Sequence, residues 1–74
     1  MPPLPRLTAS ELRRALHRLG FVEDRQRGSR LILRCRDDPG RYAVLPVHSR
    51  GVIPPGTLHH ILRTAQIRPE DLSE

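Results

Sequence analysis

The 74-residue sequence predicts a small α+β domain with the element order α-β-β-β-α, a sandwich in which two helices cover one face of a three-stranded antiparallel sheet. Three observations predict this fold. Apolar residues recur at the helical spacing i, i+3, i+4, i+7 once near each end of the chain. Three short apolar segments, separated by turns that contain Gly or Pro, lie between these stretches. Two amphipathic helices can bury their apolar stripes only on one face of so small a sheet, which leaves the opposite face open.

The first helix is expected to start after Thr8, because Thr8 and Glu11 have the spacing of a capping box. Gly20 is the expected C-cap. Between them, one apolar stripe consists of Leu12, Ala15, Leu16 and Leu19. Residues 1–7 contain three prolines and are expected to form an extended lead-in, so the folded domain is predicted over residues 8–74.

The three strands are predicted at Phe21–Arg25, Leu31–Arg36 and Tyr42–Leu45, with turns at Gln26–Ser29 and Asp37–Gly40. Alternation divides the second strand into an apolar face, Leu31, Leu33 and Cys35, and a basic face, Arg30, Ile32, Arg34 and Arg36. A face that carries three arginines is costly to bury, so we expect it to meet solvent or a ligand. Cys35, on the apolar face, is most simply interpreted as a core residue.

The second helix repeats the apolar stripe with Leu58, Ile61, Leu62 and Ala65. Its start is predicted within Pro55–Thr57, after a loop over Val47–Pro55. Pro69–Leu72 is predicted to form a final single turn with proline at the first helical position. The complete arrangement is the architecture of a double-stranded-RNA-binding-like α+β sandwich.

The basic residues are concentrated in the predicted central hairpin. Residues 25–36 carry five arginines and no acid, so their charge equals the formal net charge of +5 of the whole chain. All 13 basic residues are arginine. A glycine turn beside guanidinium groups suits a phosphate-rich partner, although net charge alone also fits a solvated, arginine-rich hairpin. The candidate RNA-binding residues are Arg25, Arg27, Gly28, Ser29, Arg30, Arg34 and Arg36.

Composition excludes several classes of site. The single cysteine allows neither an internal disulfide nor a cysteine-based zinc site, and the histidine spacing suggests no metal, so no cofactor is expected. No apolar run approaches the ~18 residues of a membrane span, and the first residues lack the apolar core of a secretion signal, so we expect a cytoplasmic protein. One Tyr, one Phe and no Trp are too few for the stacking platform that many single-strand binders use.

Five short motifs, in order along the chain, resemble the HicA family of small toxins from bacterial and archaeal toxin–antitoxin pairs. They are a helix ending in Leu-Gly-Phe, Gly-Ser before the second strand, an Asp-x-Pro-Gly turn, Pro-Val-His after the third strand, and Gly-Thr-Leu-x-x-Ile-Leu-x-x-Ala in the second helix. The resemblance runs from about Ser10 to Leu72 and implies a single HicA-like domain. It also implies a metal-independent endoribonuclease that cleaves mRNA, arrests translation and is held inactive by a HicB-like antitoxin.

The sequence departs from the family pattern at one position. In the family the second strand opens with Gly-Ser-His or Gly-Gly-His, and that histidine is taken as catalytic, whereas here Gly28-Ser29 precedes Arg30. Cleavage through the RNA 2′-OH needs a group that accepts a proton near neutral pH. Histidine, with a pKa of about 6.5, is such a group, whereas arginine, with a pKa above about 12, stays protonated. Arg30 can still hold a phosphate and stabilise charge at phosphorus. His48, in the Pro-Val-His motif, is the candidate replacement.

Three hypotheses follow from these observations. The first is a HicA-type toxin whose cleavage of RNA is absent or reduced because of Arg30, whether that arginine is natural or engineered. The second is a non-catalytic RNA-binding module on the same fold, and the third is a protein whose basic face chiefly docks an acidic antitoxin. A true double-stranded-RNA-binding domain would carry a lysine-rich second helix, and this second helix has one arginine and two histidines. We interpret His17, His59 and His60 as surface residues.

Overall fold

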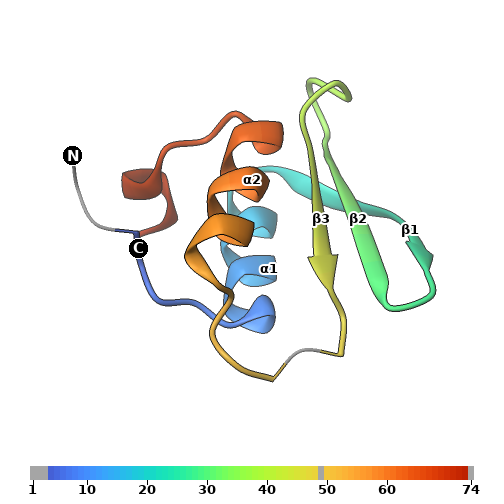
Figure 1. Ribbon diagram of the computed structural model, residues 1–74. Coiled ribbons are helices and arrows are strands. Elements are labelled where there is room, and N and C mark those ends of the chain that lie inside the picture. Colours follow the sequence, from blue (N-terminus) through green and yellow to red (C-terminus); the bar gives the residue numbers. More distant parts are fainter. Residues whose placement is uncertain (1–3, 49, 74) are drawn as a thin grey trace.

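The computed structural model describes residues 4–48 and 50–73 and has the predicted order of elements (Figure 1). The helices are α1 (Ala9–Arg18) and α2 (Pro55–Ala65), the strands are β1 (Phe21–Arg27), β2 (Arg30–Cys35) and β3 (Tyr42–Pro46), and a 3-10 turn, η1 (Pro69–Leu72), follows α2. The strands are antiparallel, with β2 in the centre of the sheet. The predicted α-β-β-β-α fold is confirmed.

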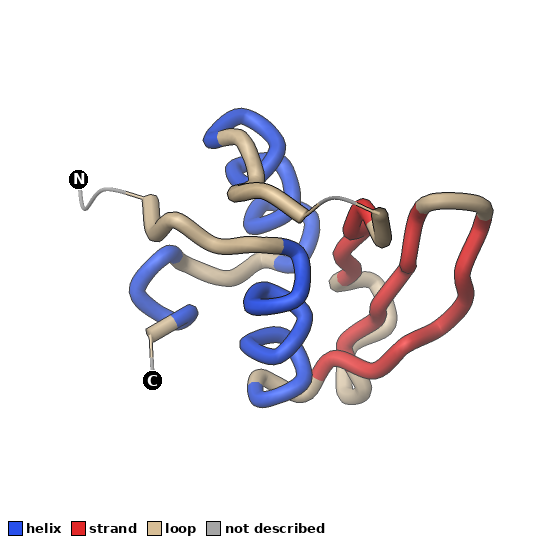
Figure 2. Tube along the Cα trace, turned by 90° about the horizontal axis from the view of Figure 1, so that it is seen from below, coloured by secondary structure: helices blue, strands red, loops and turns tan. Residues whose placement is uncertain are grey.

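The two helices and η1 lie on one side of the sheet, and no other described part of the chain covers the second side (Figures 1 and 2). Helix α2 packs on β3, while α1 packs on β1 and β3. The hairpin formed by β1 and β2 extends beyond the helices, as Figure 2 shows, and every residue of β1 after Phe21 is exposed. Two layers therefore make the whole domain, and one face of the sheet stays uncovered by the described residues.

The core lies between the helices and the inner face of the sheet. Its largest fully buried side chains are those of Leu12, Leu16, Phe21, Leu33, Leu45, Ile53, Leu58 and Ile61. In β2, Leu31, Leu33 and Cys35 are 5%, 0% and 6% exposed, which confirms the predicted apolar face of this strand. Cys35 is a buried core residue, as its position in the alternation predicted. Among the described residues no polar or charged residue is buried.

Helix α1 begins with the predicted capping box. The Thr8 N–H donates to Glu11 Oε1 at 2.9 Å, and the Glu11 N–H donates to Thr8 Oγ1 at 3.2 Å. The helix ends one residue earlier than expected, because the C-cap is Leu19 and not Gly20. Gly20 instead takes the next position with a φ of +96°, the left-handed conformation that a glycine adopts without a Cβ penalty just after a helix.

The described part of the lead-in, residues 4–7, contains no helix or strand, and residues 1–3 lie outside the described chain. Leu4 and Leu7 pack against the core, and the Leu7 carbonyl accepts a hydrogen bond from the Ile53 N–H at 2.8 Å. The lead-in is therefore hydrogen-bonded to the segment that precedes α2.

The boundaries of the strands differ from the predicted ones at the hairpin. β1 continues to Arg27, two residues further than expected, and β2 starts at Arg30 and ends at Cys35. The turn is therefore Gly28-Ser29 alone, and the expectation of a turn over residues 26–29 is wrong. Gly28 has a φ of +59°, which suits the first central position of a tight two-residue hairpin turn. Pro46 belongs to β3, where the sequence predicted the strand to end at Leu45. It lies on an edge strand, where proline is tolerated.

A β-bulge in β1 decides which way its arginines point. Glu23 lies opposite Leu33, but Arg25 and not Asp24 lies opposite Ile32, so Asp24 is an extra residue in β1. Strict alternation from Phe21 would place Arg25 and Arg27 on the helix side; the bulge moves both to the uncovered side. We call this side the open face. It consists of Val22, Arg25 and Arg27 from β1, Arg30, Ile32 and Arg34 from β2, and Tyr42, Val44 and Pro46 from β3.

Candidate nucleic-acid interface

The residues of the open face form three rows across the sheet, because residues directly opposite each other in antiparallel strands project to the same side. From the hairpin turn to the far end of β2 the rows are Arg27–Arg30–Pro46, Arg25–Ile32–Val44 and Val22–Arg34–Tyr42. The face is therefore basic beside the turn. Its central row is apolar in β2 and β3 and basic at Arg25 in β1, and its far end contains an arginine and an aromatic ring.

Arg27 and Arg30 are the cross-strand pair that closes the hairpin. Both are exposed, and neither guanidinium forms a hydrogen bond or ion pair with any described residue. Like charges directly opposite each other in a sheet are destabilising. An anion bound between the two side chains relieves this repulsion, and guanidinium groups match the oxygens of a phosphate in geometry. The pair is suited to bind a phosphate.

A shallow hollow of about 190 Å³ adjoins Arg30 and reaches the first turn of α2. It is lined by Ser29, Arg30, Val44, Leu45, Pro46 and Thr57. The N-cap of α2 is Pro54, which supplies no side-chain cap, and the N–H groups of Gly56 and Thr57 donate to no described acceptor. The positive end of the helix dipole therefore adds to the positive potential beside Arg30.

Arg34 and Arg25 differ from that pair, because both lie beside the carboxylate of Asp24. Arg34 Nε donates to Asp24 Oδ2 at 3.1 Å, and Arg25 Nε lies 3.6 Å from the same oxygen. Arg34 Nη1 also donates to the carbonyl of Pro39 at 3.1 Å, and its guanidinium lies over the Tyr42 ring, 5.7 Å from the ring centroid. Of the predicted RNA-binding arginines, Arg34 is thus already held by protein groups.

Arg36 is exposed but lies outside the sheet pairing. β2 ends at Cys35, and the Arg36 N–H donates to the carbonyl of Gly20 at 3.0 Å, in the turn after α1. The prediction that Arg36 belongs to the second strand is wrong, because its backbone bonds a turn residue and no strand residue. Its side chain forms no hydrogen bond or ion pair with the described residues.

The loop after β3 passes beside the hairpin turn. The Val47 N–H donates to the Ser29 carbonyl at 2.7 Å, and the exposed His48 is the next residue. His48 forms no hydrogen bond with any residue in the described ranges. The number of residues between Arg30 and His48 could not show whether this loop approaches the Gly28–Arg30 segment. The hydrogen bond from Val47 to Ser29 shows that the backbone of the loop lies beside that segment.

The other histidines lie on α1 and α2, the elements of the helix layer. His17 Nε2 is 3.5 Å from the carboxylate of Glu23, and His60 Nδ1 is 3.5 Å from Arg63 Nη2. His17, His59 and His60 are exposed, as predicted. Within residues 4–48 and 50–73, no group of three or more His, Cys, Asp or Glu side chains is placed to hold a metal ion.

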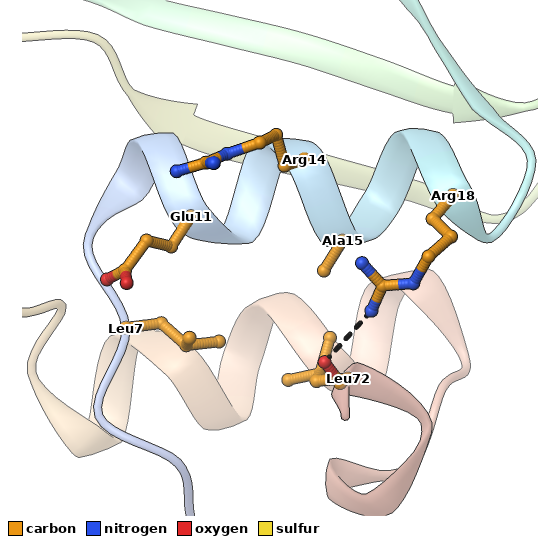
Figure 3. Close-up of a pocket in the computed structure, with 6 residues that line it drawn as sticks. All are labelled: Leu7, Glu11, Arg14, Ala15, Arg18 and Leu72. Carbon is orange, nitrogen blue, oxygen red and sulfur yellow. Dashed lines mark hydrogen bonds between the residues drawn. The ribbon is translucent and has the colours of Figure 1, made fainter. Parts of the chain in front are cut away.

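A larger hollow, of about 300 Å³, lies on the helix side between α1, the lead-in and η1 (Figure 3). It is lined by Leu7, Glu11, Arg14, Ala15, Arg18 and Leu72. Arg18 Nη2 donates to the Leu72 carbonyl at 3.0 Å across one end of this hollow, the dashed line in Figure 3. Arg18 therefore links α1 to η1 by a hydrogen bond. None of the predicted RNA-binding residues lines this hollow.

Three features of the interface were not among the predictions from the sequence. The bulge at Asp24 has no local signal, because neither Gly nor Pro marks it. The pairing of Asp24 with Arg34 depends on the strand register, which the bulge sets. The third feature is the position of Tyr42 on the open face, which the sequence could have indicated. Alternation in β3 places Tyr42 on the side opposite the buried Ala43 and Leu45.

Comparison with known proteins identifies the family. No helix in the described ranges is long and apolar enough to cross a membrane. A search of curated proteins finds no match. Residues 9–67, most of the chain, match the family described as the HicA toxin of bacterial toxin–antitoxin systems. This family implies a cognate antitoxin as a partner. The chain therefore belongs to the HicA toxin family and is a toxin of a toxin–antitoxin system.

Proposed function

We propose that this toxin binds single-stranded mRNA on its open face, with Arg27 and Arg30 as the phosphate ligands. The observation that carries the proposal is the Arg27–Arg30 cross-strand pair, two exposed guanidinium groups that face each other without an acidic partner among the described residues. Gly28 and Ser29 form a turn without bulky side chains beside them, so a phosphate can approach the backbone closely. Arg25 and Arg36 add longer-range positive potential.

Chemistry at this site depends on the residue at position 30. Attack of the ribose 2′-OH on the neighbouring phosphorus requires removal of the hydroxyl proton and protonation of the leaving 5′ oxygen. Arg30 supplies positive charge to the phosphorane-like transition state but no proton acceptor. We therefore propose that the protein as written binds RNA and cleaves it slowly or not at all. His48 follows Val47, which is hydrogen-bonded to Ser29, and is the proposed source of any residual proton transfer.

The proposed partner protein is a HicB-like antitoxin with an acidic surface. The net charge of +5 and the basic residues of the open face favour association with a negatively charged surface. An antitoxin bound there would compete with mRNA for Arg27 and Arg30. We place this competition in the cytoplasm, where mRNA is translated.

Replacement of Arg30 by histidine tests the proposal. Arg30→His is expected to cleave a single-stranded mRNA fragment at a rate at least about 100-fold above the parent, the usual contribution of a positioned acid or base. Arg14→His is the matched control, because it makes the same substitution on α1, in the helix layer, and should leave cleavage at the level of the parent. Adding His48→Gln to Arg30→His measures the part that His48 contributes.

Two results would contradict the proposal. If the parent cleaves mRNA as fast as Arg30→His, the site does not lack a proton acceptor. If neither protein binds single-stranded RNA at low salt, the open face does not bind nucleic acid, and docking of the antitoxin becomes the better account of its charge.

A further inference from the structure

The far end of the open face contains an aromatic ring that the proposed phosphate site does not use. The chain has one Tyr, one Phe and no Trp. Phe21 is 1% exposed and belongs to the core, whereas Tyr42 is 36% exposed and lies in the row Val22–Arg34–Tyr42. β3 is an edge strand, so no strand formed by residues 4–48 or 50–73 lies beyond Tyr42. The sequence predicted too few aromatics for a platform of several rings; the fold places the one exposed ring on the same face as the proposed phosphate site, at the opposite end of β2.

The ring is held by its neighbour across the sheet. The guanidinium of Arg34 lies over the ring, and is itself fixed by hydrogen bonds to the Asp24 carboxylate and the Pro39 carbonyl. The Tyr42 hydroxyl bonds to no group in the described ranges, and the contact with Arg34 is the directional interaction that the ring makes there. A guanidinium over an aromatic ring occupies one of its two faces. A preformed pair of this kind loses little conformational entropy when a second flat group stacks on it.

The spacing along β2 fits a polymer that carries phosphates and bases together. Arg30 and Arg34 are four residues apart, about 13 Å at ~3.3 Å per residue. Between them the open face is apolar in β2 and β3, where Ile32 and Val44 are both half-buried, and Arg25 completes this row on β1. The face therefore changes from a phosphate-binding pair through an apolar surface to an aromatic ring within a few nucleotides' length. Single-stranded RNA has exposed base faces that can stack on such a ring, whereas a duplex hides them between base pairs.

We propose that Tyr42, oriented by Arg34, stacks on a nucleobase of a single-stranded RNA whose phosphate lies between Arg27 and Arg30. This inference rests on the proposed function and adds to it a base-contacting residue and a preference for unpaired strands. Stacking depends on the π-face that every base has, so it holds the strand without reading a particular sequence.

The first test measures the affinity of the full chain for a fluorescein-labelled single-stranded oligoribonucleotide by anisotropy. Tyr42→Leu is expected to weaken binding about 5- to 150-fold, the range for removing one base–aromatic stack. Its slope of log K against log salt should stay that of the parent, since no charge is lost. Tyr42→Phe keeps the ring and should bind within about twofold of the parent. A duplex of the same sequence should bind the parent and Tyr42→Leu equally.

The second test uses Tyr42 as its own reporter. Because it is the chain's one tyrosine and no tryptophan is present, the tyrosine emission comes from this residue alone. Stacking of a base should quench the emission in step with the anisotropy change, after correction for absorbance by RNA. The circular dichroism spectrum of each variant establishes that it is folded.

The two proposals fail in different ways. If the parent binds RNA but its emission is unchanged and Tyr42→Leu binds as tightly, the stacking inference is overturned and the proposed RNA binding stands. If Tyr42→Phe loses as much affinity as Tyr42→Leu, the hydroxyl and not the ring makes the contact, which also overturns stacking. If the parent binds no single-stranded RNA, the proposed function fails first and the inference with it.

Discussion

Asp24 Oδ2 accepts a hydrogen bond from Arg34 Nε at 3.1 Å. The acidic residue that forms the bulge is therefore also the partner of an arginine on the open face. Asp24 is the one carboxylate within hydrogen-bonding or ion-pairing distance of Arg25 or Arg34 among the described residues. It therefore reduces the positive charge on the open face that is available to a ligand.

The first prediction concerns this carboxylate. Asp24→Asn is expected to raise the affinity for single-stranded RNA about two- to tenfold at low salt, because it removes a negative charge beside the binding site. The free energy of unfolding should change by less than about 1 kcal/mol, since the pair is solvent-exposed. Anisotropy titrations and urea unfolding measure the two quantities. Weaker RNA binding by Asp24→Asn would indicate that the orientation of Arg34 and Tyr42 matters more than charge.

The second prediction concerns the salt dependence of RNA binding. Arg27→Gln and Arg30→Gln should each reduce the slope of log K against log salt by about 0.7, the value for one phosphate contact on a single strand. Arg14→Gln removes the same charge on α1, in the helix layer, and should leave the slope unchanged. Equal slopes for all three variants would show that net charge, and not the Arg27–Arg30 pair, governs binding.

The third prediction concerns Arg41, which caps the end of α2. Its Nε donates to the Ala65 carbonyl at 2.9 Å, its Nη2 donates to Gln66 at 3.4 Å, and its guanidinium lies 5.6 Å from the centroid of the Phe21 ring. Arg41→Met should lower the free energy of unfolding by about 1–2 kcal/mol, because the carbonyls at the end of α2 lose a charged donor. Urea unfolding tests this, with Arg14→Met as the control for loss of one charge. The prediction is wrong if the two variants are equally stable.

The fourth prediction concerns stability in acid. The backbone N–H and the side chain of Thr8 lower the pKa of Glu11 below its ordinary value of 4.5, and the hydrogen bond from Arg13 lowers the pKa of Glu23 in the same way. A lowered pKa in the folded state contributes stability that is present above pH 4.5 and is lost as the pH falls through the lowered values. The melting temperature should therefore fall between about pH 5 and pH 2.

Glu23→Gln measures the share of this effect that comes from Glu23. Its melting temperature should depend less steeply on pH in the acid range than that of the parent, because one of the two titrating groups is absent. Arg13→Met should have a similar effect, since it removes the donor that lowers the pKa of Glu23. Acid sensitivity identical to that of the parent in both variants would exclude this ion pair as a cause.

The fifth prediction compares two neighbouring residues of β2. Leu33 is 0% exposed and Ile32 is half-buried on the open face. Leu33→Ala should cost about 2–5 kcal/mol, because it leaves a cavity in the core. Ile32→Ala should cost roughly 1 kcal/mol, since its side chain packs on one side only. Urea unfolding that ranks the two costs in the opposite order would contradict the assignment of the two faces.

The elements of this fold were predictable because each carries a local signal. The Thr8–Glu11 capping box fixed the start of α1, and alternation in β2 separated Leu33 from its neighbours before any pairing was known. The site was predictable only in part. Which arginines face the ligand depends on the bulge at Asp24, and a bulge is a property of two paired strands. The hydrogen bond between Arg34 and Asp24 depends on the same register, so it could not be predicted from the sequence either.

The bulge also makes the electrostatic character of this protein depend on the pairing register of β1 and β2. If the ladder ran on without the bulge, so that Asp24 lay opposite Ile32, the guanidinium groups of residues 25 and 27 would turn toward the helix layer. A shift of one residue in the β1–β2 register would thus move two guanidinium groups off the open face while every arginine remained in the sequence. Toxins of this size with the same basic residues can therefore differ in what they attract, and a comparison of their compositions would not reveal it.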